Sequence, residues 1–209
     1  MILQALYEYY QRKAADPEST IAPRGLEWKE IPYLILIDKK GKFLELQDTT
    51  EGVGKQKRAK KYLVVKSKGR TGSNSWQTAN VFWDHFGYVL AQPKNTDDKG
   101  MPKALDDAAK QHKSFVQEVR RLAEIHPSNE DIQAVAGFYD NPENLQHIKT
   151  DPLWEECIKK DGTNISFKIA GQNTIVAENP DVTSSTEDCS EKDEPIGICL
   201  ITGKKAPIA

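Results

Sequence analysis

The sequence has few of the residues that build disulfide frameworks and metal sites. Its 209 residues include three cysteines and four histidines, and no Cys-x-x-Cys pair occurs among them. An odd number of cysteines argues against a disulfide framework, and their spacing argues against a zinc site. The sequence also lacks any apolar run of about 18 residues, which excludes a membrane-spanning helix. Because the opening residues carry no secretory signal, we expect a cytoplasmic protein with reduced thiols.

Catalytic signatures are missing as well. The sequence contains no Gly-x-Ser-x-Gly, His-Glu-x-x-His, phosphate-binding loop or dinucleotide-binding motif. The pair Asp106 and Asp107 suits the negative charge favoured at a helix start better than it suits a metal site. His112 lies on the apolar stripe of the same helix, where a core histidine is the simpler interpretation. We therefore expect a protein that is not an enzyme and that holds no cofactor.

What the sequence does have is an uneven distribution of charge. The net charge is −2, but residues 55–70 contain eight lysines and arginines and no acid. The remaining 193 residues carry 21 basic and 31 acidic side chains, which is a net charge of −10. Charge segregated in this way is typical of a surface that meets nucleic-acid phosphates. The simpler alternative is a solvated run of charges, or one that pairs with the protein's own acids.

A polar loop extends this basic tract. Residues 67–80 are rich in Gly, Ser, Thr and Asn, whose backbone and side-chain donors bind phosphates. Trp76 offers a stacking face or a wedge between bases, and Asn74 and Asn80 offer amides that can pair with adenine edges. Taken singly, such asparagines are more often found in turns and helix caps. The candidate phosphate-binding residues are Lys55, Lys57, Arg58, Lys60, Lys61, Lys66, Lys68, Arg70, Thr71 and Ser73.

The pattern of apolar residues predicts an α+β fold, with antiparallel β-hairpins at both ends and a central helical block. The first hairpin joins strand 30–38 to strand 43–48 through a turn at Gly41, and a third strand follows at 62–66. Residues 81–92 are expected to form a helical turn near Asp84 and then a strand. The helical block holds a long helix over 102–125, a helix ending at Gly137 and short helices after Asn141 and Asp151. A second hairpin pairs 165–170 with 174–177, and a last strand covers 196–201.

These elements divide the chain into three parts. A β-rich part with the basic tract covers residues 1–92 and opens with an amphipathic helix over 2–15. The helical block covers residues 101–162. The remaining part, residues 163–209, holds the second hairpin, an acid-rich loop over 178–195 and the last strand.

Several short motifs occur in an order that is specific as a set, although none is specific alone. The set comprises residues 1–6 with Tyr9 and Tyr10, 21–23 with Gly25, 46–49, Gly54 with the basic tract, 64–66 with Arg70 and Thr71, 80–84, 88–90, and 199–203 with 206–209. The chain thereby resembles the N-terminal part of the large subunit of the type I-C (Dvulg subtype) CRISPR surveillance complex, Cascade. The family chain is longer, so we expect further residues beyond Ala209.

The resemblance implies a function and partners. The large subunit of such a complex recognises the protospacer-adjacent motif in duplex target DNA and helps to start the R-loop. Pairing with the guide RNA reads the rest of the target. The implied partners are duplex DNA, the CRISPR guide RNA, the other Cascade subunits and a nuclease–helicase that is recruited after target binding.

The resemblance also implies residue roles. Asn80 takes the position of a base-edge reader, and Lys66 and Arg70 take basic positions that flank the same loop. Residues 72–76 depart from the family pattern, which is richer in Pro and Ala there. An alternative function stays open, in which the chain is a scaffold subunit. The basic tract then grips the guide RNA 5′ handle and neighbouring subunits without reading DNA.

Overall fold

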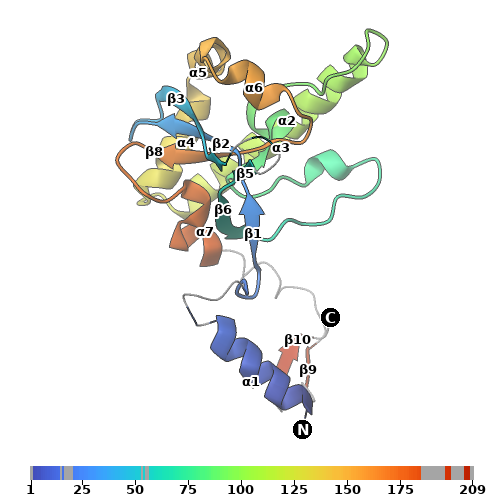
Figure 1. Cartoon of the computed structure of the whole chain (residues 1–209), viewed down its shortest axis with the longest axis vertical. Coiled ribbons are helices and arrows are strands. Elements are labelled where there is room, and N and C mark those ends of the chain that lie inside the picture. The colour runs from blue at the N-terminus through green and yellow to red at the C-terminus, as the bar shows by residue number, and fades with distance from the viewer. Residues whose placement is uncertain are drawn as a thin grey trace.

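The computed structural model describes residues 2–14, 16, 21–52, 54, 57–184, 196–198 and 205–207, and its mixture of helices and sheets confirms the predicted α+β class (Figure 1). The helices are α1 (Ile2–Ala14), α2 (Phe86–Leu90), α3 (Met101–Ile125), α4 (Glu130–Asp140), α5 (Pro142–His147), α6 (Trp154–Ile158) and α7 (Pro180–Ser184), with short 3-10 helices η2 (Ser75–Gln77), η3 (Ile148–Thr150) and η4 (Val176–Glu178). The strands are β1 (Leu26–Glu30), β2 (Tyr33–Ile37), β3 (Phe43–Asp48), β4 (Thr50–Glu51), β5 (Arg58–Ala59), β6 (Lys61–Val65), β7 (Trp83–His85), β8 (Asn164–Ile169), β9 (Ile196–Ile198) and β10 (Lys205–Pro207).

A four-stranded sheet in the order β3-β2-β8-β7 forms the centre of the protein. β2 and β3 form the predicted hairpin, whose turn places Gly41 at a φ of 82°. β8 runs parallel to β2, with Phe167 opposite Ile35, and antiparallel to β7. The first hairpin is therefore extended by a strand that lies far along the chain.

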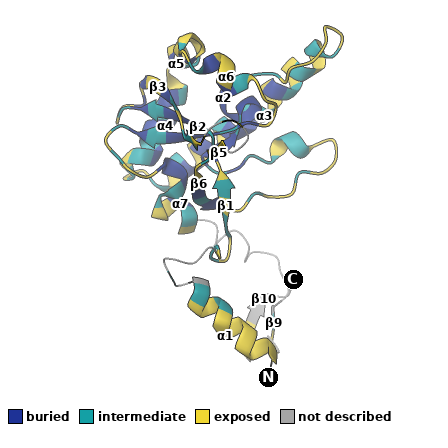
Figure 2. Ribbon diagram, viewed as in Figure 1, coloured by how far each residue is buried: buried dark blue, intermediate teal, exposed yellow. Residues whose placement is uncertain are grey.

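Helix α4 packs against this sheet and closes the core, which appears as the dark blue interior in Figure 2. The rings of Phe138 and Tyr139 lie 5.3 and 5.8 Å, centre to centre, from the ring of Phe167 on β8. The buried Asn144 ties the β2–β3 turn to the helices, because its amide nitrogen donates to the carbonyls of Gly41 and Phe138 at 3.0 and 2.9 Å. The turn and α4 are thus held at a fixed separation.

The prediction of a second hairpin over 165–170 and 174–177 is wrong. Residues 165–169 form β8 in the middle of the sheet, and residues 176–178 form the helix η4. β8 pairs with β2 along one edge and with β7 along the other, so neither edge is open to residues 174–177. At the end of the chain β9 pairs instead with β10, antiparallel. The predicted strand 196–201 is described only over Ile196–Ile198; its other residues lie outside the described part of the chain.

The predicted strand 30–38 is confirmed as β2 over Tyr33–Ile37, and it is preceded by β1 over Leu26–Glu30, a strand that the pattern did not predict. Pro32, which lacks a backbone N–H, lies between β1 and β2, where the chain passes from one sheet to the other. Its carbonyl instead accepts the backbone N–H of Thr49 at 2.8 Å. β1 pairs antiparallel with β6 in a separate two-stranded sheet, so the strand predicted at 62–66 is present as β6 and its partner is a strand that was not predicted.

The order of elements over residues 81–92 is the reverse of the prediction. The strand β7 comes first and the helix α2 follows, and the cap is His85, whose Nδ1 accepts the backbone N–H of Gly87 at 3.1 Å. The helix predicted to end at Gly137 continues as α4 to Asp140. Gly137 is needed for another reason, because a Cβ there would lie 2.9 Å from the carbonyl oxygen of Lys40.

Helix α1 and the β9–β10 pair lie at the lower end of Figure 1, away from the central sheet. The apolar stripe predicted for the first helix is exposed, with Ile2, Leu3 and Leu6 at 81, 61 and 57% of their full accessibility. None of the described helices is long and apolar enough to cross a membrane.

Candidate nucleic-acid interface

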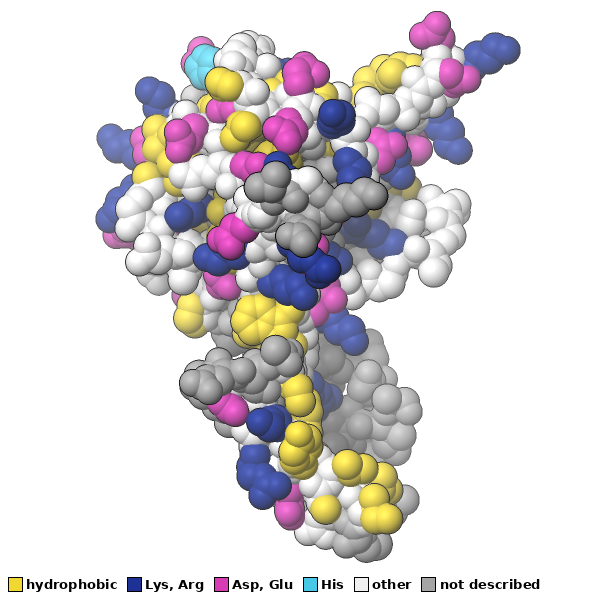
Figure 3. Space-filling model, viewed as in Figure 1, with side chains coloured by type: hydrophobic (Ala, Val, Ile, Leu, Met, Phe, Trp, Pro, Cys, Tyr) yellow, Lys and Arg dark blue, Asp and Glu magenta, His cyan; other side chains and the backbone are white. Residues whose placement is uncertain are grey.

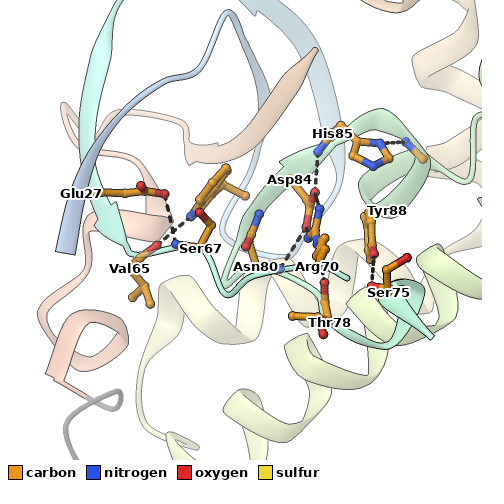
Figure 4. Close-up of polar contacts among 12 residues, drawn as sticks. Glu27, Val65, Ser67, Arg70, Ser75, Thr78, Asn80, Asp84, His85 and Tyr88 are labelled. Atoms are coloured by element: carbon orange, nitrogen blue, oxygen red, sulfur yellow. Dashed lines mark hydrogen bonds and ion pairs between the residues drawn. The ribbon is translucent and has the colours of Figure 1, made fainter. Parts of the chain in front are cut away.

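Arg70 anchors the loop of residues 67–80 to the body of the protein (Figure 4). Its guanidinium pairs with both carboxylate oxygens of Asp84: Nη1 lies 3.0 Å from Oδ1, and Nη2 contacts Oδ2. Its Nε donates to the Thr78 carbonyl at 2.7 Å, and the guanidinium lies 4.1 Å from the centre of the Tyr88 ring. Asp84 is 1% exposed, so Arg70 is the partner of a buried charge. This internal engagement differs from the phosphate contact predicted for Arg70.

A strained turn follows the loop. Phe82 has a φ of 57°, in the left-handed region that bulky side chains rarely adopt. Two hydrogen bonds fix the turn: the Asn80 N–H donates to Asp84 Oδ2 at 3.0 Å, and Ser166 Oγ donates to the Phe82 carbonyl at 2.8 Å. Asp84 therefore holds the loop from both of its sides, and strain of this kind collects at functional sites.

The side chains of the loop differ sharply in exposure. Thr71, Ser73 and Asn74 are exposed at its tip, and the Asn74 side chain makes no capping hydrogen bond to η2. Asn80 is only 8% exposed and lines a small cavity of about 70 Å³ together with Lys66 and other residues. The side-chain amide of Asn80, unlike its backbone N–H, forms no hydrogen bond with another described residue. The tip can therefore meet a duplex directly, whereas Asn80 meets only a group that enters the cavity.

The first half of the basic tract lies among the protein's own acids. Lys57 Nζ lies 3.2 Å from Asp48 Oδ2 and 3.4 Å from Glu156 Oε1 on α6, and the hydrogen bond to Asp48 raises the pKa of Lys57. Arg58 stands opposite Glu51 in the β4–β5 pair. The charges of both residues are therefore partly compensated where they stand.

Lys60 and Lys61, in the same half of the tract, also lie near other side chains of the protein. Lys61 stands opposite Glu30 in the β1–β6 pair, and Lys60 Nζ lies 5.2 Å from the centre of the Tyr62 ring. Lys55 lies outside the described residues. Figure 3 shows basic and acidic side chains interspersed over the visible face of the central body. Among the described residues 57–61, Lys57 therefore forms ion pairs with the protein's own acids, while Arg58 and Lys61 stand opposite acids on neighbouring strands.

Two lysines of the tract have a different setting. Lys66 and Lys68 are exposed, and no other described residue forms an ion pair with either. Lys68 lines a groove of about 790 Å³ between the loop around η2 and the helix α3. We call it the η2–α3 groove, and its charged and aromatic lining consists of Lys68, Trp76, Lys110, Lys113, Glu118 and Arg121. The structure therefore brings together Lys66, Lys68, Trp76 and Asn80 from the predicted site.

The contribution of α3 was missed by the sequence reasoning. Its polar groove residues follow one another at spacings of three and four, in the order Lys110, Lys113, Gln117 and Arg121. Such residues share one face of a helix. This periodicity is visible in the sequence, but only the fold shows that this face lies beside the loop.

The described residues hold no cluster of three or more His, Cys, Asp and Glu side chains that would suit a metal ion. Cys157 is buried, and burial raises the pKa of its thiol to about 12. A thiol in such surroundings is unreactive. The polar chemistry of the described site is therefore that of lysines, amides and hydroxyls.

A comparison with known proteins identifies the family of the chain. A family described as "CRISPR-associated protein (Cas_Csd1)" matches residues 6–209. The chain belongs to the Cas_Csd1 family. No curated protein matches it. Membership of the Cas_Csd1 family confirms the resemblance as far as a CRISPR-associated protein, while the subtype, the place in a longer chain and the residue roles stay predictions.

Proposed function

We propose that this Cas_Csd1 chain is a non-catalytic, cytoplasmic part of the large subunit of a type I-C CRISPR surveillance complex. In this role it recognises the protospacer-adjacent motif in duplex target DNA and helps to start the R-loop. Its partners are then the target DNA, the guide RNA, the other subunits and the nuclease–helicase. The observation that carries the proposal is the loop of residues 67–80, whose base is fixed by Arg70 and Asp84 and whose exposed tip presents amide and hydroxyl groups.

The exposure of the loop residues divides the work among them. Thr71 and Ser73 suit phosphate oxygens, because hydroxyl donors at an exposed tip can follow the backbone of a duplex. Asn74 suits a base edge in a groove, where a well-formed contact discriminates by about 1–3 kcal/mol. Lys66 and Lys68 add attraction that is independent of sequence and weakens with salt. Asn80 acts later, on a base that has left the stack.

The test is the motif preference of the assembled complex, measured as the ratio of Kd values for scrambled and motif-bearing duplexes. Asn74→Ala should lower this ratio by about 5- to 140-fold, the equivalent of 1–3 kcal/mol. Asn80→Ala should leave initial duplex binding intact and slow R-loop formation. Asn173→Ala, in the exposed loop after β8, is the matched control and should change neither. An unchanged Kd ratio in Asn74→Ala, together with an unchanged rate of R-loop formation in Asn80→Ala, rejects the reading role.

The scaffold function keeps one observation in its favour, which is the exposed apolar stripe of α1. Contiguous exposed apolar side chains often mark protein contacts. If the chain is only a scaffold, residues 57–61 should crosslink to guide RNA in complexes without DNA, and changes in the loop tip should leave target binding unaltered.

A further inference from the structure

Of the charged side chains in the η2–α3 groove, the proposed function uses only Lys68. The two walls of the groove each carry a lysine, Lys68 on the loop and Lys113 on α3, and neither forms an ion pair with another described residue. Glu118 is the one acid among the described lining residues. Its carboxylate is occupied by Arg121, whose Nε and Nη2 both lie 2.8 Å from its two oxygens. The groove therefore has two uncompensated cations facing a channel with little negative charge.

An aromatic side chain lines the groove together with these cations. Trp76 is half-buried and lines the groove from η2, which is held by the hydrogen bond from Tyr88 Oη to the Ser75 carbonyl at 3.0 Å. A lysine pair that can follow a phosphate backbone, together with an aromatic face, is the composition of a site for single-stranded nucleic acid. The bases of a duplex are stacked inside it, so only an unpaired base can stack on Trp76.

Size supports the same conclusion. A volume of about 790 Å³ is that of a cleft for a drug-sized ligand, which corresponds to about one or two nucleotides. A double helix is too thick to enter such a cleft, whereas a strand that has left its partner can lay a base and two phosphates along it. The small cavity with Asn80 and Lys66 shares Lys68 and Arg121 with the groove and so continues it.

We propose that the η2–α3 groove binds a short single-stranded stretch of nucleic acid, with one base stacked on Trp76 and the flanking phosphates bound by Lys68 and Lys113. This inference rests on the proposed function in that it assumes a nucleic-acid partner. The strand is either the DNA strand released when the duplex opens or an unpaired end of the guide RNA, since both offer the same phosphates and base faces. Binding of either strand in the groove does not require the protospacer-adjacent motif.

The test uses the 209-residue chain and fluorescent oligonucleotides of about 12 nucleotides without the motif, as single-stranded DNA, single-stranded RNA and duplex DNA. Binding is followed by anisotropy between about 50 and 200 mM salt. Trp76→Ala should weaken single-strand binding by about 5- to 140-fold, as loss of one stacked base does. Lys113→Gln should weaken it and lower the salt slope by about 0.7, the value for one phosphate of a single strand.

Matched controls separate the groove from general effects. Trp28→Ala removes an exposed tryptophan on β1, and Lys103→Gln removes an exposed lysine about 15 Å along the same helix; both should bind single strands as the unaltered chain does. Tighter binding of DNA than RNA identifies the released strand as the occupant, and the reverse identifies the guide. The proposal is overturned if both groove variants bind the single strands with the same affinity as the unaltered chain. Because the oligonucleotides lack the motif, this result is independent of the motif-preference ratio that tests the proposed function.

Discussion

Replacing Arg70 should destabilise the protein far more than the loss of an ordinary surface ion pair. Asp84 is 1% exposed. When the guanidinium is removed, its carboxylate still accepts hydrogen bonds from the backbone N–H groups of Asn80 and His85, at 3.0 and 2.8 Å. Loss of one partner of a buried ion pair typically costs about 3–5 kcal/mol. Because those two N–H groups remain, we expect Arg70→Met to lower the free energy of unfolding by about 3 kcal/mol, at the lower end of that range.

Urea unfolding of three further variants, Arg120→Met, Asp84→Asn and the double change of Arg70 and Asp84, makes this reasoning refutable. Arg120→Met removes the guanidinium that pairs with Asp140 on the surface, where both side chains are more than half exposed, and should cost about 0–1 kcal/mol. The double change Arg70→Met with Asp84→Asn removes the buried charge together with its partner and should recover about 2 kcal/mol relative to the sum of the single changes. A cost of Arg70→Met no larger than that of Arg120→Met would show that solvent reaches Asp84 and that Arg70 does not anchor the loop.

Two further predictions concern stability. Gly41→Ala should lower the free energy of unfolding by about 2–5 kcal/mol, because the φ of Gly41 is 82° and the new Cβ would lie 2.4 Å from the Ala134 carbonyl oxygen. Gly171→Ala is the control: its φ is similar but open space surrounds it, so the change should lower the free energy of unfolding by only about 1–2 kcal/mol. Burial lowers the pKa of His85 and of His112 below the usual 6.5, so the unfolded chain binds more protons and stability should fall as the pH drops through about 6.5. Urea unfolding between pH values of about 7.5 and 5.5 measures this, and His112→Gln should flatten the dependence.

The sequence was a good guide wherever neighbouring residues decide the structure. The β2–β3 hairpin follows from Gly41 between two apolar strands, and α3 follows from its apolar stripe. Asn129 and Asn141 cap α4 and α5 with side-chain oxygens that accept backbone N–H groups, as asparagine before a helix predicts.

It failed where partners come from far along the chain or where every side chain is buried. Residues Phe86–Leu90 are buried on all sides, so no periodicity marks them as a helix rather than a strand. β8 alternates the apolar Ile165, Phe167 and Ile169 with polar residues, which marks it as a strand but does not show that its neighbours are β2 and β7.

The candidate site shows the same division. Composition alone located the loop of residues 67–80 and its lysines. Composition did not distinguish Lys68 from Arg70, because both are basic residues of one tract. Lys68 lines the η2–α3 groove, whereas Arg70 forms an ion pair with Asp84. Only the fold sets α3 against the loop, and with it the opposite wall of the groove.

The parallel pairing of β2 with β8 affects how the protein folds while it is synthesised on the ribosome. Ile35 and its partner Phe167 are 132 positions apart in the sequence. At a synthesis rate of 5–20 residues per second, β8 is therefore made about 7–26 s after the β2–β3 hairpin whose free edge it covers. Throughout that interval the edge of β2, with its run of aliphatic side chains, is open to any other nascent chain. Slower elongation over the helical segment would lengthen this exposure, and a chaperone that shields a bare strand edge should raise the yield of folded protein.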